Sequence, residues 1–259
     1  MQIAENGSID FSQPLKITSA ASLQRAEAEL ERLLEAHKAS QNRNQLPTYR
    51  PYTKQALFHR LGREPFSERL LMAGNQVGKT LSAGSEWAMH LTNRYPDWWD
   101  GATFDKPPVL WASGESTEST RDNPQRILMG PPMMPELWGT GTIPGDAVLE
   151  VRRRQGSVSN ALDSVVVQWG GGGDVQAGQA VLQFKAYEQG REKWQGPTID
   201  GTWFDEEPPE DIHSEGTTRT QAGQRSIFTA MTFTPLKGMS VVVRSYLTDA
   251  DLAVMTGAA

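Results

Sequence analysis

Residues 69–84 read RLLMAGNQVGKTLSAG, in which a short apolar strand breaks at a glycine and the chain restarts as a helix. Arg69–Met72 supplies the strand, and Thr80 begins the helical pattern. In the loop between them, backbone N–H groups and the positive end of a helix converge on one small volume, which suits a polyphosphate. The alternative is a chance glycine turn followed by a lysine.

The residue types in this loop indicate separate roles. Gly78 allows the backbone to approach a ligand closely, Lys79 reaches the terminal phosphates, and the Thr80 hydroxyl holds Mg²⁺. Ala73 stands where the first glycine of such a loop usually stands. We expect the whole loop to contact a nucleotide, through Ala73, Gly74, Asn75, Gln76, Val77, Gly78, Lys79 and Thr80.

Composition excludes several classes of protein. The 259 residues suffice for one large domain, or for a domain with appendages. The absence of cysteine excludes disulfide scaffolds, thiolate zinc sites and cysteine nucleophiles. A formal net charge of -6 excludes a globally basic nucleic-acid binder, so any DNA contact must come from local patches. No stretch approaches the roughly 20 apolar residues that span a bilayer, and we expect a soluble protein that contacts no membrane.

Short apolar runs alternate with helical or turn-rich stretches along most of the chain. This alternation predicts an α/β fold with a mainly parallel central β-sheet flanked by helices. The runs are Leu70–Met72, Val109–Ala112, Val165–Trp169, Val181–Phe184, Thr202–Phe204, Ile227–Phe233 and Val241–Val243. A helical pattern covers Thr80–Thr92, and Gly170–Gly173 reads as the tip of a hairpin.

A separate amphipathic helix is expected near the N-terminus, from Ser22 to about Ser40. Its apolar stripe at helical spacing consists of Leu23, Ala26, Leu30, Leu33 and Leu34. Such a helix packs against the protein or a partner; the alternative is a regulatory arm.

A second polar site is expected where GTWFDEEPPED, residues 201–211, turns from apolar to acidic. Carboxyl ends of strands face the ligand crevice of such a sheet. Asp205 is therefore placed near the Mg²⁺ held by Thr80, and Glu206 can polarise an attacking water as general base. The alternative is a solvated acidic surface run, which is how we interpret Glu207, Glu210 and Asp211.

The stretch IFTAMTFTPLKGM, residues 227–239, has strand-like residues that lead to Thr232 and Thr234. A hydroxyl at the end of a strand beside the acidic strand can sense a γ-phosphate. The alternative, a threonine that serves only β-propensity, applies to Thr229 and Thr232.

Four segments in order, AGNQVGKT, YEQGREKWQG, WFDEEP and MTFTPLKGM, together resemble the ATPase domain of bacteriophage large terminase subunits, from about Pro47 to Val243. The resemblance implies a P-loop NTPase of the ASCE type. It implies that Lys79 and Thr80 bind phosphate and Mg²⁺, and that Asp205 and Glu206 are the second-motif aspartate and the catalytic glutamate. Thr232–Pro235 matches the motif that couples hydrolysis to movement.

The same resemblance extends upstream to YRPYTKQALFHR, residues 49–60. It implies that Gln55 hydrogen-bonds the adenine base and that Tyr52 stacks near it. An amide can pair with the donor and acceptor edge of adenine while an aromatic ring covers its face. The alternative is that Gln55 is an ordinary exposed helix residue.

One departure from the family concerns the charge at the γ-phosphate. Many terminases carry an arginine in the loop about where Asn75 stands here. An arginine finger from a neighbouring subunit contributes about 10³–10⁵ in rate in comparable enzymes. Arg121 is the first candidate for this catalytic role and Arg126 the next; either can instead be a plain surface arginine.

The resemblance implies ATP hydrolysis with Mg²⁺ that powers translocation of double-stranded viral DNA into a procapsid. It implies as partners DNA, a portal protein, a small terminase subunit and other copies of the chain in a ring, in the host cell cytoplasm and transiently at the procapsid. We expect an arm at residues 1–45, the ATPase domain at 46–250 and a tail at 251–259, with no nuclease domain before Ala259. The rival hypotheses are another P-loop DNA translocase or helicase, and a shortened terminase-like subunit with an assembly or regulatory role.

Overall fold

The computed structural model describes residues 23–24, 26–33, 44–63, 68–156, 158–170, 177–225, 228–234, 240–248 and 253–256. The chain divides into two compact units, Met1–Ser40 and Gln41–Ala259. In the first unit the described residues are helical, as their apolar spacing predicts, and Leu23 and Leu30 are exposed. Leu34, the last residue of the expected stripe, lies outside the described residues.

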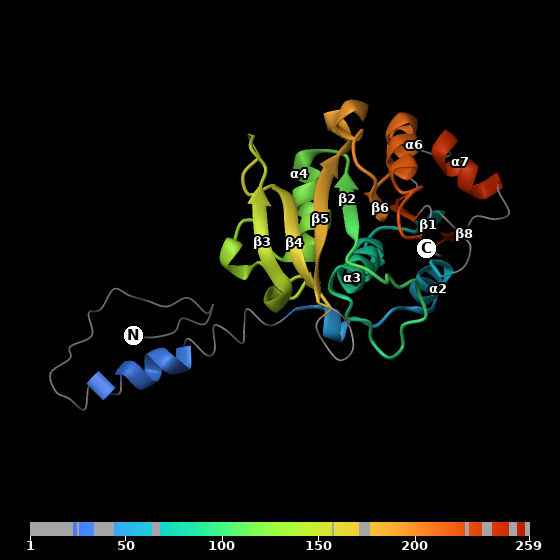
Figure 1. The fold of residues 1–259 in the computed structure, drawn as a ribbon. Helices are drawn as coiled ribbons and strands as arrows, with labels where there is room; N and C mark the ends of the chain where they lie inside the picture. The colour runs from blue at the N-terminus through green and yellow to red at the C-terminus, as the bar shows by residue number, and fades with distance from the viewer. Residues whose placement is uncertain are drawn as a thin grey trace. The chain divides into compact units, whose positions relative to one another are not determined.

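The second unit is built on one sheet with the strand order β3-β4-β5-β2-β6-β7-β1-β8 (Figure 1). Its strands are β1 Glu68–Met72, β2 Val109–Gly114, β3 Val148–Arg153, β4 Leu162–Trp169, β5 Gly178–Ala186, β6 Gly201–Asp205, β7 Thr229–Phe233 and β8 Ala253–Thr256. Pairing is parallel from β5 to β8 and antiparallel between β3 and β4 and between β4 and β5. The prediction of a mainly parallel sheet is confirmed.

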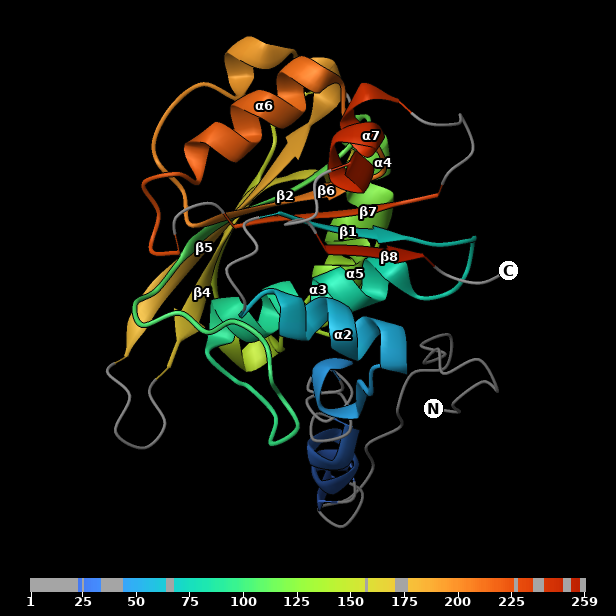
Figure 2. The same ribbon diagram turned by 90° about the vertical axis from the view of Figure 1, so that its right-hand side faces the viewer.

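Helices cover both faces of this sheet, with α6 and α7 on one side and α2, α3 and α5 on the other (Figure 2). They are α2 Thr53–Leu61, α3 Lys79–Thr92, α4 Thr117–Thr120, α5 Arg126–Met129, α6 Glu210–Arg219 and α7 Val241–Thr248. A π-type turn, Arg121–Gln125, joins α4 to α5. Short 3-10 turns occupy Leu46–Thr48, Pro135–Leu137, Gly145–Ala147, Tyr187–Gln189 and Arg191–Lys193.

The two layers of helices enclose two apolar clusters. Because side chains alternate along a strand, adjacent residues of β6 enter different clusters. Trp203 packs in the cluster that includes Trp87 of α3, and Phe204 packs in the one that includes Tyr246 of α7. Every residue of β6 and β7 is buried, which explains why these strands read as continuous apolar runs.

Two expectations at the C-terminal end are wrong. Val241–Val243, read as a strand, forms the first turn of α7, where Val243 packs in the same cluster as Tyr246 one turn later. Residues 253–256, expected to belong to a tail, form β8, which pairs with β1 through the register Leu70↔Val254. Residues 253–256 form a strand because they pair with the edge of β1, and the sequence of this short segment does not by itself predict a strand.

The local predictions nearer the loop hold. The expected helix Thr80–Thr92 is α3, which begins one residue earlier. The expected hairpin joins β4 to β5, although residues 171–173 of its tip lie outside the described residues.

Candidate nucleotide-binding site

The loop from β1 to α3 needs an unusual backbone at two positions. Gly78 has φ +79° and precedes the first turn of α3, and Gln76 has φ +60°. A Cβ atom added to Gly78 would lie 3.0 Å from the Gln55 amide nitrogen. The positive φ favours glycine at residue 78, and a side chain there would also press against the Gln55 amide.

The sheet order brings the two predicted motifs together. β7 lies between β1 and β6, and all three strands are parallel, so their carboxyl ends share one edge. The Thr80 hydroxyl donates a hydrogen bond to Asp205 Oδ1 at 3.2 Å, and the Thr232 hydroxyl donates to the same oxygen at 2.8 Å. Thr232 thus contacts the acidic motif directly.

Burial controls the charge of Asp205. The side chain is almost fully buried, and this burial raises its pKa from 3.8 to about 7. The hydroxyl of Thr232 opposes the rise, the charge of Glu206 adds to it, and Thr80 and Lys79 oppose it. A divalent cation beside this carboxylate would favour its ionised form.

The donor set fits Mg²⁺. A threonine hydroxyl and a carboxylate are hard oxygen ligands, and Mg²⁺ in nucleotide sites is held by one or two protein groups together with phosphate oxygens. The described residues contain no cluster of three or more His, Cys, Asp or Glu side chains able to hold a metal without a substrate. A cation at Thr80 and Asp205 would complete its coordination with water or with phosphate oxygens.

Lys79 is buried at the centre of the site. Its Nζ donates to the Gly74 carbonyl at 2.8 Å and to the Thr234 hydroxyl at 2.9 Å. Burial lowers the pKa of Lys79, while the charges of Glu206 and Asp205 raise it. The Thr234 hydroxyl donates in turn to Asn75 Oδ1 at 3.0 Å, so Thr234 connects the loop to the end of β7.

Glu206 follows β6 and is exposed, with an unusual φ of +65°. Its N–H donates to the Thr232 carbonyl at 2.7 Å, and its Oε2 accepts from the Thr234 N–H at 3.1 Å. The carboxylate borders a cavity of about 730 Å³ that Tyr187, Thr234 and Ser240 also line. Water can reach this carboxylate.

Gln55 and Tyr52 lie beside the loop, at a cavity of about 340 Å³ that Ala73, Val77 and Lys79 also line. Tyr52 is 75% exposed and Gln55 is 6% exposed. Gln55 Nε2 donates to the carbonyls of Val77 and Gly78 at 3.4 and 3.2 Å, and Oε1 accepts from the Tyr52 N–H. Gln55 is therefore not an ordinary exposed helix residue, because its amide supports the loop.

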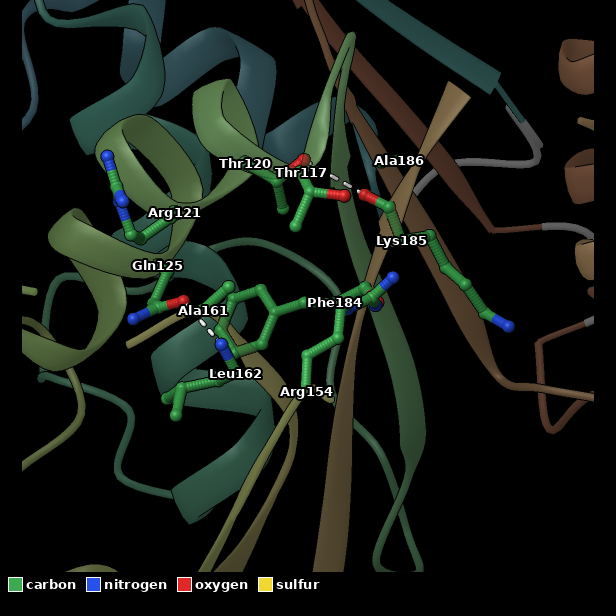
Figure 3. A pocket seen from close by; sticks show the side chains of 10 residues that line it. All are labelled: Thr117, Thr120, Arg121, Gln125, Arg154, Ala161, Leu162, Phe184, Lys185 and Ala186. Carbon is green, nitrogen blue, oxygen red and sulfur yellow. Dashed lines mark hydrogen bonds between the residues drawn. The ribbon is translucent and has the colours of Figure 1, made fainter. Parts of the chain in front are cut away.

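Arg121 is not brought to the site. Its guanidinium donates to both carboxylate oxygens of Asp122, at 2.7 and 2.9 Å, and to the Ser159 carbonyl and Glu118. The hydrogen bond to Asp122 is the main cause of its raised pKa. Figure 3 shows it at a small pocket by α4 and β5, pointing away from the strand that carries Lys185. Arg126 is exposed, and its Nε donates to the Asp122 carbonyl at 2.8 Å.

Tyr187 is the site residue that reasoning from single motifs missed. It belongs to YEQGREKWQG, which entered the sequence analysis only as part of the family resemblance. Its hydroxyl contacts the backbone carbonyls of Asp205 and Glu206 at 3.0 and 2.9 Å. Its position after β5 gives no local sign of this contact.

A protein-family model described as "Terminase large subunit, T4likevirus-type, N-terminal" matches residues 70–254, which contain the loop, Asp205, Glu206 and Thr234. The chain belongs to this terminase family. The large terminase subunit of Salmonella phage P22 is 40% identical over 232 residues, which is 85% of this chain. This terminase chain spans 46% of the length of the P22 protein.

Solved structures support the fold of this terminase chain. The large terminase ATPase domain of Thermus phage P74-26 matches with a TM-score of 0.54 and 17% identity, covering 83% of this chain and 83% of that one. The large terminase of a thermophilic bacteriophage, solved in complex with ADP, matches with a TM-score of 0.50 and 14% identity, covering 80% of this chain and 45% of that one. The predicted α/β fold, with helices on both sides of a mainly parallel sheet, is confirmed.

Proposed function

We propose that this terminase chain binds and hydrolyses ATP with Mg²⁺ and that the hydrolysis drives double-stranded viral DNA into a procapsid. The observation that supports this proposal most is the convergence of three strand ends on one site. Lys79 and Thr80 come from the loop after β1, Asp205 and Glu206 from β6, and Thr234 from β7. Hydrolysis of a nucleoside triphosphate needs these groups within reach of one phosphate.

Each group has a chemical task in this proposal. The buried ammonium of Lys79 exchanges its present acceptors for phosphate oxygens. Thr80 and Asp205 hold Mg²⁺, which when bound neutralises charge on the phosphates. Glu206 accepts a proton from the attacking water, and general-base catalysis of this kind contributes about 10²–10⁴ in rate.

The base has a candidate place in the cavity between α2 and the loop. Tyr52 is exposed there and can cover one face of adenine. Gln55 supports the loop carbonyls in the present arrangement, so pairing with adenine requires its amide to exchange partners. An ADP complex of one structural relative agrees with nucleotide binding by this fold.

The partners that we propose follow from the family. They are DNA, a portal protein, a small terminase subunit and further copies of the chain in a ring, in the host cell cytoplasm and transiently at the procapsid. Arg121 or Arg126 supplies the arginine finger of a neighbouring copy, and Arg121 must first leave Asp122. Among the described residues, no helix is long and apolar enough to cross a membrane.

Steady-state ATP hydrolysis over a wide range of protein concentration tests this proposal, with Glu206→Ala, Lys79→Ala and Arg121→Ala alongside. We expect turnover per subunit to rise with concentration. Glu206→Ala should lose about 10²-fold or more while still binding ATP, and Lys79→Ala should also bind ATP more weakly. Binding without hydrolysis at every concentration would instead favour an assembly or regulatory role. Unchanged turnover in Arg121→Ala would remove that residue as the finger.

A further inference from the structure

We infer that Tyr187 is a positioning residue for Glu206, the proposed hydrolytic glutamate. The Tyr187 hydroxyl fixes the two peptide units that flank the Glu206 Cα atom. This inference rests on the proposed function, in which Glu206 is the general base. The hydroxyl lies 3.0 Å from the Asp205 carbonyl oxygen and 2.9 Å from the Glu206 carbonyl oxygen. These oxygens belong to the peptide units before and after that Cα.

The Glu206 backbone needs such support. Its φ of +65° lies in the left-handed region, which side chains other than glycine rarely adopt. Conformations of this kind persist only when the surroundings over-determine them. The Glu206 N–H donates to the Thr232 carbonyl at 2.7 Å, and the Glu206 carbonyl accepts a hydrogen bond from the Tyr187 hydroxyl at 2.9 Å.

The backbone conformation decides where the carboxylate points. In the observed conformation Oε2 accepts from the Thr234 N–H at 3.1 Å, beside the hydroxyl that meets Lys79. A Glu206 that relaxed to ordinary negative φ would carry its side chain away from this contact. The same change in backbone conformation would also move Asp205, because one peptide unit joins the two residues.

The tyrosine itself is rigidly held. Its side chain is 5% exposed, and its ring lies against Phe204 and Trp194. The turn that carries it is closed by Gln189, whose Oε1 accepts from the Ala186 N–H at 3.2 Å, and by the Trp194 indole, which donates to the Ala186 carbonyl at 3.3 Å. The segment YEQGREKWQG thus holds the Tyr187 side chain in one position.

The hydroxyl acts as a donor at every ordinary pH. Burial and the charge of Asp205 raise the pKa of Tyr187 well above its usual value. The hydroxyl donates toward two carbonyl oxygens and also makes a hydrogen bond with the Ser113 side chain. A phenylalanine at this position keeps the ring packing but removes this donor.

Tyr187→Phe separates positioning from packing, and Tyr246→Phe is the matched control. Tyr246 is 1% exposed, belongs to the same apolar cluster, and its hydroxyl donates to Glu68 Oε2 at 3.0 Å, away from the loop. We expect Tyr187→Phe to lower kcat about tenfold or more with ATP affinity within about two-fold. Tyr246→Phe should leave both values within about two-fold.

Amide hydrogen exchange followed by NMR gives a second readout that does not require turnover. In Tyr187→Phe the N–H groups of Glu206 and Thr234 should exchange about tenfold faster, because both hydrogen bonds depend on the Glu206 conformation. The amides of Ala230 and Met231 in β7 should not change, and Tyr246→Phe should not affect Glu206. If the wild-type chain alone turns over too slowly to measure, the exchange result decides.

Glu206→Ala, measured alongside, separates the two claims. If Glu206→Ala is inactive but Tyr187→Phe matches the wild type in kcat and exchange, the positioning inference fails and the proposed function stands. Full activity in Glu206→Ala overturns both. Loss of ATP binding in Tyr187→Phe, or faster exchange throughout the sheet, overturns the inference in favour of a purely structural role.

Discussion

Asp205 is buried beside the hydroxyl groups of Thr80 and Thr232, so its protonation state depends on the charges and hydrogen bonds around it. With its pKa at about 7, the carboxyl is neutral through much of the acidic range unless a cation is bound. Ionisation is then linked to Mg²⁺ binding, since the metal requires the deprotonated ligand. In the proposed site, the carboxylate that would bind the cation would therefore also change its charge on binding.

The raised pKa predicts how stability depends on pH in the absence of Mg²⁺ and nucleotide. Between pH 3.8 and about 7 the folded state keeps a proton on Asp205 that the unfolded chain has lost. The free energy of unfolding contributed by this group therefore falls as pH rises through that window, by an amount on the order of a few kcal/mol. Urea unfolding at about pH 5 and about pH 8 measures this fall.

Asp205→Asn is the control for this prediction, because an amide keeps the shape but does not titrate. The unfolding free energy of the wild type should fall, relative to that of the variant, as pH rises from about 5 to about 8. A difference that stays constant between the two pH values would contradict the raised pKa.

At the scale of elements, β1, α2 and α3 are joined by one buried carboxylate. Glu86 of α3 is fully buried, and Arg69 of β1 approaches it at 2.8 Å, while His59 of α2 lies 2.6 Å away. Burial alone would raise the pKa of Glu86, but Arg69 and the two histidines His59 and His90 hold it well below its usual value. The two elements that flank the loop, β1 and α3, and the helix that carries Gln55, α2, are therefore joined through Glu86.

Removing this charge should destabilise the fold strongly. Glu86→Gln leaves the buried guanidinium of Arg69 without its counter-ion, and breaking a buried pair in this way costs about 3–5 kcal/mol. Glu118→Gln is the control, because this carboxylate is 71% exposed and pairs with Arg121 at 3.4 Å; exposed pairs contribute about 0–1 kcal/mol. Chemical denaturation compares the two, and equal losses would refute the role assigned to Glu86.

The sequence predicts elements well where the signal is local. The strand, loop and helix of residues 69–92 can be predicted because an apolar run, glycines and helix-forming residues follow one another. β6 can be predicted because its apolar run leads directly to Asp205. β8 was missed because its order comes from the edge of β1, and Val241–Val243 was misread because three valines favour a strand until Tyr246 adds helical spacing. The contacts of Gln55 and Tyr187 are made across long sequence separations, so no local pattern contains them.

At the scale of the whole molecule, the division into two units yields a further prediction. In the part of the chain that the structure describes, the strands of the sheet and both apolar clusters lie within residues 41–259. A chain that begins at Gln41 should therefore fold, with a thermal midpoint within about 3 °C of that of the full chain. A change of about 1 kcal/mol in stability produces a shift of about this size in such a domain. Circular dichroism during heating measures this midpoint, and a molten or unfolded shorter chain would show that residues 1–40 are needed for the core.

The hydrogen bonds around Thr232 have an optical consequence. The indole N–H of Trp203 donates to the Thr232 hydroxyl at 2.8 Å, and that hydroxyl donates to the carboxylate of Asp205. The buried indole of Trp203 is thus two hydrogen bonds from the carboxylate proposed to bind the cation. A change of charge on Asp205 would alter the electric field along the indole, so we expect the ultraviolet absorption and emission of Trp203 to shift if a cation binds there.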